Sequence, residues 1–244
     1  MLPELAAATW VGLVLAAFVV GIGKSAIPAV GALAVVLGAA VLPARESTGV
    51  LLVMFLLGDV FAVATYHRNA QWRLLARLAP ALLAGILGGA VFLAWADDRI
   101  TAITIGVILI SLIALTLVNR RRGSSPRPHT GTYGILGGFT MMVANAGGPP
   151  MSLYFLAQRL QILAFLGTSA WLFALTNLVR LPFSIGLGLV TGKTLALTLA
   201  LLPVIAAGFF AGRVFVRRID QRMFDRIVIL ATIAGAAYLI LDAA

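Results

Sequence analysis

The sequence contains no cysteine and few side chains that carry charge. Without cysteine the chain has no disulfide, no thiolate metal site and no cysteine nucleophile. Charged residues make up 11% of the 244 positions, with 8 Asp and Glu and 2 His. No group of these residues has the spacing of a metal site, and His67 and His129 both lie outside the apolar spans, where neither can serve a Ser-His-Asp triad. The sequence therefore predicts no enzyme, no catalytic residue, no metal and no cofactor.

Long polar segments are also missing. Hydrophobic residues make up 61% of the chain and the mean hydropathy is +1.07. Apolar stretches repeatedly reach the ~20 residues that a helix needs to cross a bilayer. The longest polar linker, 119–130, leaves no room for a soluble domain. We predict an all-α, multi-pass protein of a bacterial plasma (inner) membrane, and we interpret the net charge of +10 as cytoplasmic loops in contact with the lipid bilayer, not as a nucleic-acid surface.

Two of the apolar runs are interrupted by glycine and proline. Such residues inside a membrane helix predict two short helices that meet at a loop. The residues expected to break the helices are Gly21, Gly23 and Pro28 in the run 5–42, and Pro149 and Pro150 in the run 131–167. The pattern leaves open whether each broken run is a re-entrant hairpin or two tilted crossings. Each break is a candidate binding loop.

The two halves of the chain share one order of elements. Each has a broken run followed by three spans, expected near 48–66, 74–95 and 100–118 in the first half and near 168–190, 194–216 and 224–241 in the second. Pro28 aligns with Pro149, and Asp59 with Arg180, at one offset of 121 residues. A constant offset indicates an internal duplication. The predicted division is a first membrane repeat over 1–118, a basic linker expected in the cytoplasm over 119–130 and a second membrane repeat over 131–244.

Basic residues follow different spans in the two halves. In the first half Arg68 and Arg73 follow the first span, whereas in the second half Arg213 and Arg217 lie at the end of the second span. Because basic loops stay in the cytoplasm, equivalent loops must face opposite sides of the membrane. The sequence therefore predicts two repeats of inverted topology, an architecture of many secondary transporters.

The breaks and the charges inside the spans predict an anion site. A helix that begins at a break directs unpaired N–H groups and the positive end of its dipole toward the break. A charge at membrane depth costs at least ~2.5 to 3.5 kcal/mol, so a functional role is the first hypothesis for each one. The residues expected to bind substrate are Lys24, Ser25, Asn145, Gly147, Gly148, Asn177 and Arg180. We expect Asp59 to couple or gate transport.

Structural interpretations of the same residues stay open at this point. Gly147 and Gly148 can serve only the close packing of helices. Lys24 can extend to a membrane interface. Asp59 and Arg180 can form a permanent ion pair without any transport role.

These breaks resemble the TauE/SafE family of sulfite and organosulfonate exporters. The matching pieces are Gly21 to Pro28, Gly134, Gly137, Gly138, Asn145 to Pro150, Thr168 and Ser169. The resemblance covers nearly the whole chain, although Lys24 stands where many members have a small residue. It implies a plasma-membrane permease for small sulfur-containing anions.

The functional prediction is a secondary transporter, in the direction of export, for sulfite or an organosulfonate. The anion is expected to bind near the midplane of the membrane at the two broken-helix loops, with the proton as a candidate coupling ion. Two alternatives remain. One is a transporter of another small solute, such as a carboxylate or a divalent cation, and the other is a non-transporting membrane scaffold. The oligomeric state is left undefined.

Overall fold

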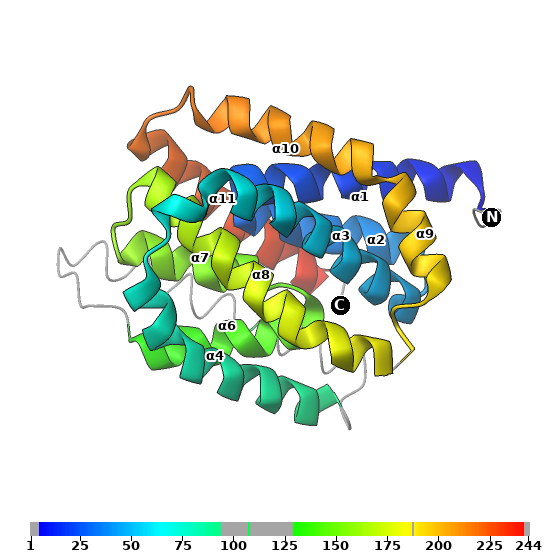
Figure 1. Ribbon diagram of the computed structural model, residues 1–244, viewed down its shortest axis with the longest axis horizontal. Helices are drawn as coiled ribbons and strands as arrows, with labels where there is room; N and C mark the ends of the chain where they lie inside the picture. Colours follow the sequence, from blue (N-terminus) through cyan, green and yellow to red (C-terminus); the bar gives the residue numbers. More distant parts are fainter. Residues whose placement is uncertain (1–4, 94–106, 108–128, 187, 242–244) are drawn as a thin grey trace.

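The computed structural model describes residues 5–93, 107, 129–186 and 188–241. In these ranges the regular elements are helices (Figure 1). They are α1 (Ala7–Ser25), η1 (Pro28–Val30), α2 (Gly31–Val41), α3 (Ala44–Tyr66), η2 (His67–Asn69), α4 (Trp72–Leu93), α6 (Thr130–Ala144), α7 (Gly148–Ala157), α8 (Ile162–Gly186), α9 (Gly192–Ala200), α10 (Leu202–Val216) and α11 (Gln221–Leu241). The span expected over 100–118, the loop before it and most of the 119–130 linker lie outside the described residues.

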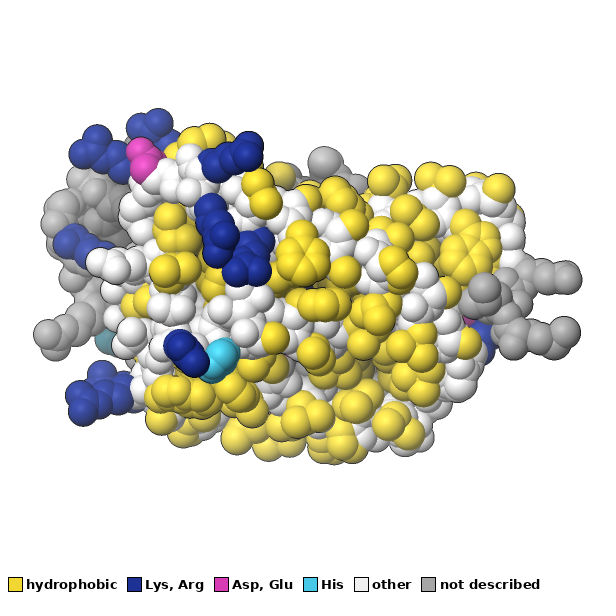
Figure 2. Space-filling model, turned by 45° about the horizontal axis from the view of Figure 1, so that its top comes forward, with side chains coloured by type: hydrophobic (Ala, Val, Ile, Leu, Met, Phe, Trp, Pro, Cys, Tyr) yellow, Lys and Arg dark blue, Asp and Glu magenta, His cyan; other side chains and the backbone are white. Residues whose placement is uncertain are grey.

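Four helices of the described chain are long and apolar enough to cross a membrane. They are α1, α4, α8 and the helical segment Glu46–Asn69, which covers most of α3. Large hydrophobic side chains such as Leu87, Leu178 and Phe210 are more than half exposed, as expected of a surface that faces lipid. Figure 2 shows hydrophobic side chains over most of one face, with lysines and arginines gathered toward one end. That is the end where η2 and the α10–α11 loop lie in Figure 1.

The span expected over 194–216 is bent. Helices α9 and α10 meet at an angle of 49° around Leu201, and together they make a fifth candidate crossing. Pro203 lies in the first turn of α10, where its missing N–H costs no helical hydrogen bond. The span predicted near 194–216 is therefore found as two helices with a bend between them, because Pro203 separates the two helices at this point.

The predicted start of the preceding span, expected near 168–190, was wrong. Helix α8 begins at Ile162 and not near Thr168, because the chain turns earlier, at Arg159, whose φ is 55°. Gly167, expected to end the broken run, lies inside α8. A Cβ on Gly167 would lie 2.7 Å from the carbonyl oxygen of Tyr66, so this glycine lets the chain just after α3 pack closely on α8.

Both broken runs fold as hairpins. In the first, Gly12 of α1 packs against Val41 at the end of α2, and Gly23 packs against Gly31 at its start, so α2 returns along α1. In the second, the hydroxyl of Thr130 lies 3.0 Å from that of Tyr154, which joins the start of α6 to the end of α7. With 15 residues, α6 is about 22 Å long and falls short of a ~30 Å hydrocarbon core.

The glycines expected to break the first run lie inside α1. The helix continues to Ser25, and the break is at Ala26 and Ile27. Gly21 faces α10, where a Cβ would lie 2.5 Å from the backbone nitrogen of Phe209 and closer still to a carbonyl oxygen. Gly21 and Gly23 therefore serve helix packing, and the prediction that they break the helix was wrong. The prolines stand where expected, because Pro28 opens η1 and Pro149 and Pro150 lie in the first turn of α7.

Candidate functional site

The two breaks touch each other. Gly148, the first residue of α7, lies against the backbone of Pro28 and Ala29 in the other break. A Cβ on Gly148 would lie 2.9 Å from the carbonyl carbon of Pro28, and closer still to its oxygen. Only glycine therefore permits this approach without a backbone shift.

Local chemistry sets the shape of the second break. Helix α6 ends at Asn145, which adopts a left-handed backbone with φ 53° and ψ 16°. Asparagine tolerates this conformation better than most residues and is common at helix C-termini. The next residue, Ala146, donates its N–H to the carbonyl of Thr140 at 3.1 Å. The chain reverses there, and Gly148 begins α7 two residues later.

A small cavity of about 30 Å³ lies where the breaks meet. One water molecule needs about 10 to 15 Å³ by this measure, so the space exceeds that of a single water. Six of the predicted binding residues line it: Lys24, Asn145, Gly147, Gly148, Asn177 and Arg180. The lining also includes the apolar side chains of Val20, Ala32, Phe55, Met141 and Phe173. The cavity is therefore lined by polar groups on one part of its surface and by apolar side chains on the rest.

Lys24 and Asp59 form an ion pair beside this cavity. The Lys24 ammonium lies 2.5 Å from one Asp59 oxygen, and the amide nitrogen of Asn177 donates to the other at 2.8 Å. The rings of Phe55 and Phe173 lie 5.1 and 4.9 Å from the ammonium and contribute cation–π contacts. Asp59 is 2% exposed. Its negative charge is thus satisfied by Lys24 and Asn177.

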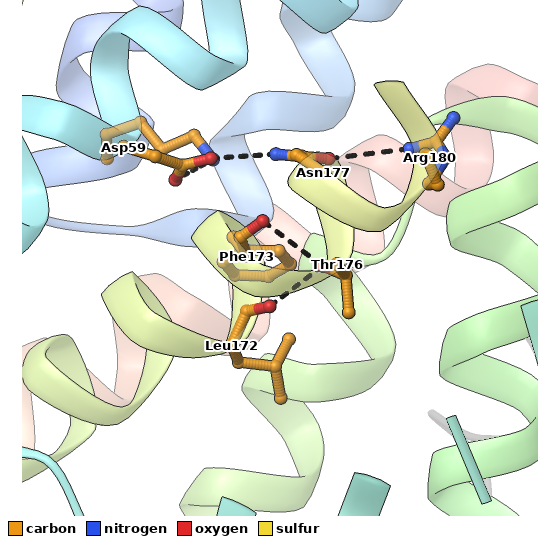
Figure 3. A network of polar contacts seen from close by, with 7 residues as sticks. Asp59, Leu172, Phe173, Thr176, Asn177 and Arg180 are labelled. Carbon is orange, nitrogen blue, oxygen red and sulfur yellow. Dashed lines mark hydrogen bonds and ion pairs between the residues drawn. The ribbon is translucent and has the colours of Figure 1, made fainter. Parts of the chain in front are cut away.

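The structure gives no direct ion pair between Asp59 and Arg180. Figure 3 shows Asn177 between them, joined to Asp59 on one side and to Arg180 on the other. The hypothesis of a permanent Asp59–Arg180 pair was wrong, because the Asp59 carboxylate is paired with Lys24 at the end of α1.

Arg180 is buried without a countercharge among the described residues. It is 3% exposed, and its Nη2 donates to the side-chain oxygen of Asn145 at 2.7 Å. Its Nη1 reaches the side-chain oxygen of Asn177 only at 3.5 Å, and its Nε has no hydrogen-bond partner. With Lys24 and Asp59 neutralising each other, the cavity keeps one net positive charge. A guanidinium presents its donors in a planar fork that matches an oxyanion.

Ser25 is not brought to the cavity. Its hydroxyl donates to the carbonyls of Gly21 and Ile22 at 3.0 and 3.3 Å, within its own helix. Its backbone carbonyl accepts a hydrogen bond from the hydroxyl of Tyr66 at 2.9 Å. Tyr66 thereby fixes the end of α1 to the end of α3, a role that the sequence analysis missed.

Two aromatic lining residues were also missed. Phe55 lies four residues before Asp59, and Phe173 lies four residues before Asn177. Residues four apart share one face of a helix, so this spacing is the signal that marks them. Within the described residues, no group of three or more His, Asp or Glu side chains lies together as a metal site.

A scan against family models matches residues 5–239 to a family described as Sulfite exporter TauE/SafE. The match covers nearly the whole chain. Comparison with curated proteins and with solved structures gave no match.

Proposed function

The chain belongs to the Sulfite exporter TauE/SafE family, and from this premise we propose that it is a secondary transporter for a small sulfur-containing oxyanion. The family consists of membrane transporters and not of enzymes, and the chain is a multi-pass membrane protein. Sulfite and small organosulfonates are the proposed substrates, export is the proposed direction, and a bacterial inner membrane is the proposed location.

One observation supports this proposal more than any other. Arg180 is buried and lacks a carboxylate partner in the described chain, and its Nε has no acceptor. A buried charge without a partner is costly, so a site that keeps one is poised for a counter-ion. An oxyanion in the cavity would neutralise the net positive charge. The same charge argues against a divalent cation as substrate.

We propose distinct roles for the residues around the anion. Arg180 binds the oxyanion through its free N–H donors, and Asn177 orients the guanidinium from the side of Asp59. Gly147 and Gly148 place the start of α7 at the cavity, where the positive end of the helix dipole favours an anion. Lys24 lines the cavity, and its charge stays balanced by Asp59.

We propose that the two halves are inverted repeats with the anion site near the midplane, and the pairing of equivalent residues and helices supports the repeats. Lys24 and Asn145 are 121 residues apart, and so are Asp59 and Arg180. The offset of the duplication therefore relates the Lys24–Asp59 contact to the Asn145–Arg180 contact. Each hairpin also packs on a helix of the other half, since α1 packs on α10 and α6 packs on α4. We propose that alternating access moves a hairpin against the long spans.

Flux through reconstituted vesicles tests the proposed transport. Liposomes that contain the protein and are loaded with radiolabelled sulfite or sulfoacetate are expected to release the label faster than protein-free liposomes. Unlabelled sulfonate on both sides should compete with the label, whereas acetate should not. Release no faster than from empty liposomes would contradict the proposal, and co-purification of one fixed protein partner would then favour a scaffold.

Proton coupling is assigned to the Lys24–Asp59 pair. In wild-type vesicles an imposed proton gradient is expected to change the rate of anion flux. In the double variant Lys24→Met/Asp59→Leu, which removes both titratable groups together, the rate should no longer respond to the gradient. An unchanged response in the double variant would show that the pair does not carry the coupling proton.

A further inference from the structure

The two breaks hold their neighbouring spans by different chemistry. We propose that the hydrogen bond between Arg180 and the side-chain oxygen of Asn145 is a latch, that is, a contact that opens when substrate binds. The substrate anion would accept from the same guanidinium group and so displace the Asn145 oxygen. Anion binding then exchanges one acceptor for the other and releases the α6–α7 hairpin from α8. The Lys24–Asp59 pair meanwhile keeps the α1–α2 hairpin on α3. This inference rests on the proposed function, since it requires an anion at Arg180.

The two contacts are equivalent in position. Lys24 lies in the last turn of α1 and Asn145 directly follows α6, so both stand at the beginning of a break. Each one reaches a long span 35 residues further along the chain, at Asp59 in α3 and at Arg180 in α8. Each contact therefore ties a hairpin to the span that follows it.

The two contacts differ in charge. Lys24 and Asp59 neutralise each other beside the rings of Phe55 and Phe173. An external anion therefore finds no unpaired positive charge at this contact. At Arg180 the acceptor is a neutral amide oxygen, and the cation stays uncompensated. A guanidinium binds an anionic oxygen more strongly than a neutral one. Exchange is therefore favourable at Asn145 and unfavourable at Asp59, so the two halves do not respond equally to the anion.

The backbone of Asn145 suits this role and suggests clean variants. At φ 53° an alanine would be strained, whereas glycine and aspartate accept the left-handed conformation. Asn145→Gly removes the competing oxygen and keeps the turn. Asn145→Asp replaces that oxygen with a permanent anionic partner for Arg180. The two variants thus shift the same exchange in opposite directions.

Binding of sulfite or a sulfonate to the purified full-length protein tests the exchange. Loss of one competing hydrogen bond should make the anion bind to Asn145→Gly up to about tenfold more tightly than to wild type. Asn145→Asp should lose measurable binding. The matched control Asn69→Asp, at an exposed position in η2, should bind as the wild type does.

The outcomes separate the latch from the proposed function. If the wild type binds the anion and Asn145→Gly binds it no more tightly, the latch is wrong while the anion site stands. If neither protein binds sulfite or a sulfonate, both are wrong. Binding to Asn145→Gly alone would support the latch, because the wild-type oxygen then blocks the site.

Distance measurements keep the test independent of the stability of these variants. Because the chain has no cysteine, two introduced cysteines can carry the only spin labels. Labels at the exposed positions Ile135 and Leu178 report on α6 against α8, and labels at Val11 and Val60 report on α1 against α3. The anion should shift the first distance and leave the second unchanged. A shift in both distances, or in neither, would overturn the proposal.

Discussion

An Arg180→Gln variant is expected to fold and insert but to bind no anion. The substitution removes the uncompensated cation of the cavity and most of its free N–H donors. Wild-type protein at ~100 times the dissociation constant of its ligand should gain about 2.7 kcal/mol of stability, and the variant should gain none. Thermal unfolding in detergent, with and without sulfite, measures both values.

Controls separate the charge of Arg180 from its shape. Arg77→Gln removes an exposed arginine of α4 and should keep the full stabilisation by anion. Arg180→Lys keeps the charge but loses the planar fork, so it should bind the anion more weakly than wild type. Without ligand, Arg180→Gln should be no less stable than wild type, since it removes a buried unpaired charge. Undiminished binding by Arg180→Gln would exclude Arg180 from the site.

An Asp59→Asn variant is expected to be strongly destabilised. Without the carboxylate, the buried ammonium of Lys24 loses its countercharge and stands near a second cation, Arg180. Removal of one partner of a buried ion pair costs about 3 to 5 kcal/mol. Thermal unfolding without added ligand measures the loss, and an unchanged melting temperature would mean that the pair contributes nothing to the fold.

A double variant tests the partner of Asp59. Lys24→Met alone should destabilise the protein, because it leaves the carboxylate without its ammonium. Lys24→Met/Asp59→Leu should recover most of the stability, since apolar residues of similar volume often replace a buried pair at little cost. A harmless Lys24→Met together with a damaging Arg180→Gln would instead support a direct pair between Asp59 and Arg180.

Local chemistry explains which parts of the fold could be predicted. A proline has no N–H to donate and is favoured in the first turn of a helix, so Pro28 and Pro149 located both breaks. Proline alone is not decisive, because Pro80 and Pro182 lie inside α4 and α8. Glycine is ambiguous, because the same residue ends one helix and lets another pack closely. Gly21 belongs to the second kind, and only the position of α10 against it decides this. The inverted repeat and the domain boundaries remain predictions.

Which residues line the cavity could be predicted better than which of them bond to one another. Lys24, Asn145, Asn177 and Arg180 all line one cavity, as their position in the breaks and spans suggested. Their pairing depends on how the hairpins lie against α3 and α8, which no local pattern encodes. Asp59 therefore pairs with Lys24, and Asn145 faces Arg180 as an acceptor. Whether these residues bind substrate remains a proposal.

The most direct test of the account is the thermal stability of the purified wild-type protein against a panel of anions. The panel contains sulfite, sulfate, thiosulfate, sulfoacetate, taurine, phosphate and acetate at equal ionic strength. A positive cavity that serves a sulfur oxyanion predicts a selective rise in melting temperature with sulfite or a sulfonate. Equal stabilisation by acetate, or no stabilisation by any member of the panel, would contradict it.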